Sequence, residues 1–280
     1  MPRPRRRGAR RQLRRRRAAV TVLFVLAALS AAAAPVFWSP EPDGAGGSAP
    51  EPEPTTPLTG TSSPVTPAPT TPPPPVLSLA GDFPTDGPGT FRYATTEGSV
   101  LGGSGTLVRF RLAIEDPIDE DPDGFARFVD ETLGGEQGWT AGAGTRFQRV
   151  PEGAPFDITI YLATGGTTTR MCAGAGLNVV SPGLPDGGVS CHFSGQVVIN
   201  LARWRLSVPH YASEGVPLET YRQMVLNHEV GHALGLGHEA CPGPGEPAPV
   251  MQQQTIKLDG CLANAWPYLD GRRYSGQPVG

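Results

Sequence analysis

The chain has 280 residues and a formal net charge of -3 at pH 7, but this charge is unevenly distributed. Ten arginines and no acidic residue occupy positions 1–17, which leaves 13 basic and 26 acidic residues in the rest of the chain. An acidic body without a basic stripe or a nucleic-acid motif argues against nucleic acid as a partner. The arginine-rich head, residues 1–17, instead precedes an apolar segment, and we interpret it as a cytoplasmic flank that sets membrane topology.

The apolar segment 18–38 begins with 17 residues that carry no charge, "AAVTVLFVLAALSAAAA". About 20 apolar residues cross a bilayer as a helix. An uncleaved single-pass signal anchor is favoured by the apolar length and by Trp38, whereas the small-residue run 30–34 fits a cleaved signal peptide. The expected localisation is the cell membrane with the remaining chain outside, or secretion after cleavage.

Residues 39–78 form a segment made largely of Pro, Thr, Ser, Gly and Glu. Such a composition buries too little apolar surface to offset the entropy lost on ordering. A proline-rich chain of this kind extends by about 3 Å per residue. We therefore predict a disordered stalk, followed by one domain at 79–280 with about 200 residues, enough for a packed core.

Strands are predicted in this domain at 89–95, 105–115, 156–163 and 195–202. Segment 105–115 shows the clearest pattern, because apolar side chains alternate with Arg109 and Arg111 at a period of two. The apolar positions of that segment are Val108, Phe110, Leu112 and Ile114.

Helices are predicted at 121–133 and 217–234. Asp121 and Pro122 suit the N-cap and first position of a helix, and apolar residues then recur at helical spacing at Phe125, Phe128, Val129 and Leu133. The order of elements, followed by a loop-rich tail, predicts an α+β (mixed α/β) fold in which a helix packs on a twisted sheet.

The second helix carries "HEVGHALGLGH", residues 228–238. His228 and His232 lie one turn apart on one face, and Gly235 suits the left-handed turn that ends a helix. His238 then returns as a third ligand, so that three imidazoles hold one Zn²⁺ and leave a position for water. Glu229, about 100° around the helix axis from His228, lies outside the ligand set and is predicted to be the general base that deprotonates this water.

The full pattern HExxHxxGxxH resembles the metzincin zinc metalloproteases. His228, His232 and His238 match the zinc ligands of that family, Glu229 its general base and Gly235 its helix-ending glycine. Met251, in "APVMQQQT", stands where the family has a Met-turn beneath the metal. The matched motifs cover 217–255, and the resemblance implies a twisted sheet whose edge strand, here "GQVVINLARW", packs beside the active-site helix.

The layout of the whole chain most resembles an uncharacterised metzincin-like family of membrane-anchored or exported proteins from high-GC Gram-positive bacteria. The shared features are the arginine-rich head, one hydrophobic segment, a Pro/Thr stalk and the motifs "MCAG", "SCHF" and "HEACPG" around the histidine pattern. This resemblance implies the fold and the zinc site more than it implies a substrate.

The domain contains four cysteines, an even number that predicts disulfides in an exported protein. A cysteine metal site is disfavoured because the cysteines lack paired spacing. Sequence order favours Cys172–Cys191 and Cys241–Cys261, and closing loops of this size is worth about 3 kcal/mol each.

Other polar residues near these motifs are expected to be structural. His192 and His210 stand alone and are assigned to the surface or the core. Arg203, Trp204 and Arg205 follow the predicted edge strand and are expected to form a structural face instead of contacting substrate.

The sequence as a whole predicts a metalloendopeptidase outside the membrane that acts on a peptide or protein substrate. Two alternatives are a zinc amidase acting on cell-wall peptide and a zinc-binding module without turnover. The presence of Glu229 favours the enzymes. The N-terminal segment makes the membrane a further expected partner.

Overall fold

A computed structural model describes residues 73–184 and 188–279. The predicted head 1–17, the apolar segment 18–38 and stalk residues 39–72 lie outside the described residues. The chain from 73 onward lies against the domain, where the Val76 carbonyl accepts a hydrogen bond of 2.8 Å from the Leu218 amide.

The prediction of a transmembrane helix is corrected by the structure. None of the helices within 73–184 and 188–279 has the length and apolarity needed to cross a bilayer. Because the segment 18–38 lies outside the described residues, the single-pass anchor has no support and is not carried further.

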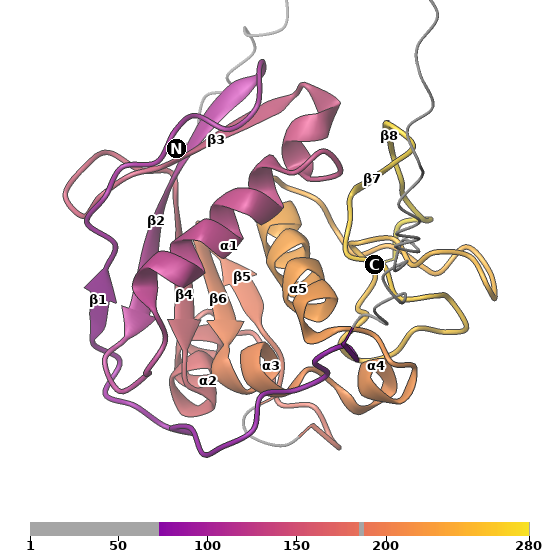
Figure 1. Cartoon of the computed structure of the whole chain (residues 1–280), viewed down its shortest axis with the longest axis horizontal. Coiled ribbons are helices and arrows are strands. Elements are labelled where there is room, and N and C mark those ends of the chain that lie inside the picture. The colour runs from indigo at the N-terminus through magenta and orange to yellow at the C-terminus, as the bar shows by residue number, and fades with distance from the viewer. Residues whose placement is uncertain (1–72, 185–187, 280) are drawn as a thin grey trace, which may run out of the picture. The chain divides into compact units, whose positions relative to one another are not determined.

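The fold is a mixed α+β arrangement built on an open, twisted and mostly parallel sheet (Figure 1). The strand order is β1-β2-β4-β6-β5. Strand β3 lies off this path and pairs with residues 106–110 of β2, whereas β4 pairs with residues 110–114. Strands β2, β3, β4 and β6 run parallel, whereas β1 and β5 are antiparallel to their neighbours. The six strands are β1 (Phe91–Tyr93), β2 (Thr106–Glu115), β3 (Thr145–Arg149), β4 (Ile158–Ala163), β5 (Cys191–Phe193) and β6 (Gln196–Asn200).

Five α-helices occur in the described part of the chain: α1 (Pro122–Gly134), α2 (Gly165–Gly174), α3 (Leu201–Leu206), α4 (Pro209–Ser213) and α5 (Leu218–Ala233). A short 3₁₀ helix covers Trp139–Gly142, and a small two-stranded sheet near the C-terminus joins β7 (Tyr268–Leu269) to β8 (Arg272–Arg273). The helices predicted at 121–133 and 217–234 are confirmed as α1 and α5. The predicted N-cap is also confirmed, since the Asp121 carboxylate accepts hydrogen bonds from the amides of Asp123 and Gly124.

The sequence-based assignment of the edge strand is wrong. Segment 195–202 forms β6, which lies inside the sheet between β4 and β5. The true edge is β5, which folds back on β6 through a turn at Ser194 and Gly195, both with positive φ. Strand β6 also ends earlier than predicted, because the Asn200 side chain caps α3 by accepting a 2.9 Å hydrogen bond from the Ala202 amide.

The main core lies between the sheet and helices α1 and α5, which cross the same face of the sheet in Figure 1. Alternation along the strands divides the side chains between two cores. On β6, Val197 and Ile199 face the main core, whereas Val198 faces a smaller core beneath α2. Helix α5 is buried on several sides, since the C-terminal segment also packs on it through Val250, Met251 and other residues. This enclosure places the histidine motif inside the domain.

Both predicted disulfides are confirmed. Cys172–Cys191 joins α2 to β5, and Cys241–Cys261 joins two loops of the C-terminal segment. Among the described residues no cysteine is left free. Two disulfides suit an extracellular or secreted protein, because reducing compartments do not maintain them.

The paired replacements Cys172→Ala/Cys191→Ala and Cys241→Ala/Cys261→Ala are each expected to lower the free energy of unfolding by about 3 kcal/mol, because each disulfide closes a loop of about 20 residues in the unfolded chain. Urea denaturation measures the change, and peptide mapping without reductant checks the pairing. Crossed pairs or four free thiols in the wild-type protein would contradict the structure.

Candidate metal centre

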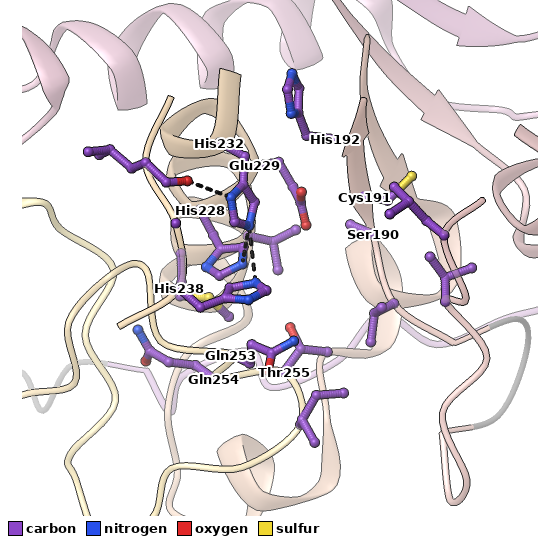
Figure 2. A pocket seen from close by; sticks show the side chains of 18 of the residues that line it. Ser190, Cys191, His192, His228, Glu229, His232, His238, Gln253, Gln254 and Thr255 are labelled. Carbon is purple, nitrogen blue, oxygen red and sulfur yellow. Dashed lines mark hydrogen bonds between the residues drawn. The ribbon is translucent and has the colours of Figure 1, made fainter. Parts of the chain in front are cut away.

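Three histidines converge at the C-terminal end of α5 (Figure 2). The Nε2 atom of His232 lies 3.2 Å from Nε2 of His228 and 3.2 Å from Nε2 of His238. One ring nitrogen from each residue lies within 4.8 Å of the others. His228 and His232 share a helix face, and His238 reaches them because the chain reverses at Gly235, which has a φ of +90°.

In two of these rings, the hydrogen bond made by Nδ1 determines whether Nε2 carries a proton or a lone pair. Nδ1 of His228 lies 2.8 Å from the Val250 carbonyl, and Nδ1 of His232 lies 2.8 Å from the Leu236 carbonyl. A carbonyl oxygen only accepts, so both Nδ1 atoms donate, and a neutral ring then carries a lone pair on Nε2. Lone pairs that face each other at 3.2 Å repel unless a cation lies between them.

The donor set fits a tetrahedrally coordinated transition metal. With Zn–N distances of about 2.0–2.1 Å, adjacent nitrogens of a tetrahedral site lie about 3.3 Å apart, close to the spacing of these imidazoles. Neutral imidazole is a ligand for zinc, copper, iron and nickel. Carbonyl groups that hold the outer ring nitrogen are the usual second partners of metal-binding histidines.

Burial keeps the rings of His228 and His238 in the neutral form that binds metal. Burial, together with the nearby His232, lowers the pKa of His228 to about 3. The same two causes also lower the pKa of His238. His228 and His238 are therefore poor proton acceptors and remain available to a metal at neutral pH.

Glu229 lies beside His232 in the same cavity (Figure 2). Its exposed fraction is 6 %, and within the described ranges its carboxylate takes part in no ion pair or side-chain hydrogen bond. Burial alone raises its pKa in the metal-free protein to about 8. A buried carboxylate without a partner is costly, and a cation at the three histidines would favour its charged form.

The cavity that contains these residues has a volume of about 520 Å³. One wall is formed by α5 and the segment that follows it. The opposite walls come from the edge strand β5, the loop around Leu177 and Val179, and the segment 253–256. A space of this size on one side of the histidines accommodates part of a larger ligand.

Met251 packs against α5 beside the histidine cluster. It is fully buried. Its sulfur lies only 2.3 Å from the position that a Cβ atom on Gly231 would occupy. The Trp139 ring lies 2.9 Å from the same point. Position 231 must therefore be glycine if Met251 and Trp139 are to contact α5 between the turns that carry His228 and His232.

The C-terminal tail holds the third histidine, a role that sequence analysis did not identify. The His238 carbonyl accepts a hydrogen bond of 3.0 Å from the Val279 amide, and the carboxylate of Glu239 pairs with Arg273 at 2.9 Å. Both charged groups are largely buried, which makes this pair more than a surface contact. No local pattern could have revealed it, because Glu239 and Arg273 are 34 residues apart in sequence.

The expected structural residues mostly behave as predicted. His210 binds the Gln254 carbonyl through Nε2 at 2.8 Å. Trp204 packs edge-on against the rings of Phe125 and Phe128, so the structural assignment of this face is confirmed. His192 is the exception, because it is only half-buried and lines the cavity.

Replacing Gly231 with alanine is expected to lower the free energy of unfolding by about 1–3 kcal/mol, because the added methyl group overpacks a filled core. Gly237→Ala provides the matched control, since a Cβ atom there meets nothing within 4 Å. Thermal denaturation of both variants tests the contact. Equal stability of the two variants would argue against Met251 lying beneath α5.

The metal-free protein is expected to be most stable between about pH 4.5 and 6.5. The pKa of Glu229 is raised from 4.5 to about 8, so the folded state loses stability as pH rises through this range. The pKa of His228 is lowered from 6.5 to about 3, so stability is lost as pH falls through that range. Urea denaturation across pH measures both effects. Glu229→Gln should remove the decline above pH 6.5 and leave the acid decline, and an unchanged alkaline decline would contradict this assignment.

Comparison with known proteins gives one family match. The family model described as "Protein of unknown function (DUF3152)" matches residues 77–265, about two-thirds of the chain and all of the histidine motif. No curated protein matches the chain. No solved structure matches it either. The chain therefore belongs to the DUF3152 family of proteins of unknown function.

Proposed function

We propose that this domain is a zinc-dependent metallopeptidase of the metzincin type. His228, His232 and His238 would hold one Zn²⁺, and Glu229 would act as the general base. The observation that carries the proposal is the convergence of three imidazole nitrogens beside a buried, unpaired carboxylate in one cavity. Packing alone does not require three histidines to direct their ring nitrogens at one another.

Two further features support the relationship to metzincins. Gly235 ends α5 with positive φ and returns His238 to the other two ligands, as the pattern HExxHxxGxxH requires. Met251 lies directly under α5 at Gly231, which is consistent with the role of a Met-turn. The Val250 carbonyl, one residue earlier, binds the outer nitrogen of His228.

The protein residues in this mechanism have separate tasks. Zinc, when bound, would act as a Lewis acid that polarises a carbonyl group and lowers the pKa of water. Glu229 accepts a proton from the attacking water on its carboxylate and returns it to the leaving amine. The carbonyls of Val250 and Leu236 hold His228 and His232 in one orientation.

A zinc amidase acting on cell-wall peptide would use the same residues and is the alternative to be tested beside the peptidase. An idle zinc-binding module is less well supported, because it gives no reason for an unpaired carboxylate at Glu229 in the cavity. Cleavage of casein and of purified cell wall, each with and without a chelator, compares these functions. Chelator-sensitive cleavage of neither material would favour the idle module.

Two variants separate metal binding from catalysis. Glu229→Gln is expected to retain about one zinc per domain while activity falls by about 10²–10⁴-fold, the usual contribution of a general base. His232→Ala is expected to lose both zinc and activity, because it removes a ligand. Zinc content is measured by atomic absorption and activity by the cleavage assay.

The control for these variants is Glu219→Gln, which changes an exposed glutamate in the first turn of the same helix. It is expected to retain zinc and activity. Full activity in Glu229→Gln would rule out the proposed base. Unchanged zinc content in His232→Ala would rule out the proposed ligand set.

A further inference from the structure

His192 is directed into the cavity by the geometry of the edge strand. Strand β5 alternates its side chains between the two faces of the sheet. Cys191 pairs across the ladder with Val198, on the face covered by α2, whereas His192 pairs with Val197, on the face covered by α5. Because the disulfide to Cys172 holds Cys191 on the α2 side, it also keeps His192 on the α5 side.

The imidazole of His192 has one aromatic neighbour among the described residues, the ring of His232. Its ring centroid lies 6.5 Å from that of His232, with the two planes inclined by 19°. Within the described residues neither of its ring nitrogens makes a hydrogen bond, in contrast to His210, which binds the Gln254 carbonyl. Burial, with a smaller effect of His232, lowers its pKa, so the ring is neutral and offers one N–H donor.

His192 is also separate from the metal ligands. The group of residues whose ligand atoms approach within 4.8 Å contains His228, His232 and His238, and His192 is not among them. His192 and His232 nevertheless line the same cavity. A small group held at the three histidines would therefore share its cavity with a hydrogen-bond donor that has no partner among the described residues.

We propose that His192 is a catalytic residue that contacts substrate, and that it donates a hydrogen bond to the oxygen of the carbonyl group bound at the three histidines. This inference rests on the proposed hydrolytic function and extends it. During attack by water that oxygen gains negative charge, and a donor placed in advance in a partly desolvated cavity stabilises it. The bond transfers no proton, so Glu229 remains the only acid–base group.

The test compares the zinc-loaded full-length chain with His192→Phe, which keeps a planar ring but removes the donor, and with His192→Gln, which keeps an amide donor. Acetohydroxamate serves as the probe because it binds metal through its oxygens and needs no turnover. Loss of one hydrogen bond is expected to weaken its binding about tenfold in His192→Phe, with partial recovery in His192→Gln. Zinc content should stay at one per domain in both variants.

The kinetic result expected for His192→Phe is a lower kcat with little change in KM on whichever material is cleaved, because the bond strengthens in the transition state. Phe193→Leu is the control, since the neighbouring side chain on the same strand packs in the α2 core, and it should leave probe binding unchanged.

Two outcomes would overturn the assignment. Equal acetohydroxamate affinity in wild type and His192→Phe would show that His192 makes no contact with the bound group. Loss of zinc in both His192 variants would instead make it a ligand. Because probe binding requires metal but no hydrolysis, the absence of any cleavage would count against the proposed function without deciding the position of His192.

Discussion

Repulsion between imidazole lone pairs is the constraint on which this domain depends. Two Nε2 atoms lie 3.2 Å from a third, and two of the rings are locked in this orientation by carbonyl groups behind them. Such an arrangement is unfavourable in the absence of a cation. The surrounding fold must therefore hold it in place, and the contacts around α5 can be understood as the means of doing so.

Three parts of the chain provide this support. The sheet and α1 pack on one side of α5, and Met251 with Trp139 fills the opposite side at Gly231. The C-terminal tail fixes the segment after His238 through Val279 and the Glu239–Arg273 pair. The Cys241–Cys261 disulfide links the loops between these contacts. Each connection limits how far the rings can separate in the metal-free protein.

The opposite side of the cavity is held by a different kind of contact. The edge strand β5 is only three residues long, so its hydrogen bonds to β6 alone would hold it weakly. The Cys172–Cys191 disulfide ties this strand to α2 behind the sheet. One cross-link thus gives a short strand a defined orientation, and this orientation places His192 in the cavity near His232.

The features that the sequence by itself determined are those encoded within a few residues. His228, Glu229, His232 and His238 lie within eleven positions, and helix geometry alone brings His228 and His232 onto one face. The period of β2 and the capping residues of α1 likewise act locally, so both elements were predicted. The short helices α2, α3 and α4 lack such periodicity; α2, for example, is "GGTTTRMCAG" and was not predicted.

Only the tertiary structure decided which strand forms the edge, which side chains enter the cavity and which residues Met251 and Glu239 contact. The turn at Ser194 and Gly195 places β5 outside β6, which reversed the expected edge and brought in His192. The contact of Met251 with Gly231 and the pair Glu239–Arg273 join residues 20 and 34 positions apart. Such contacts depend on how the chain packs as a whole, and no periodicity in the sequence records them.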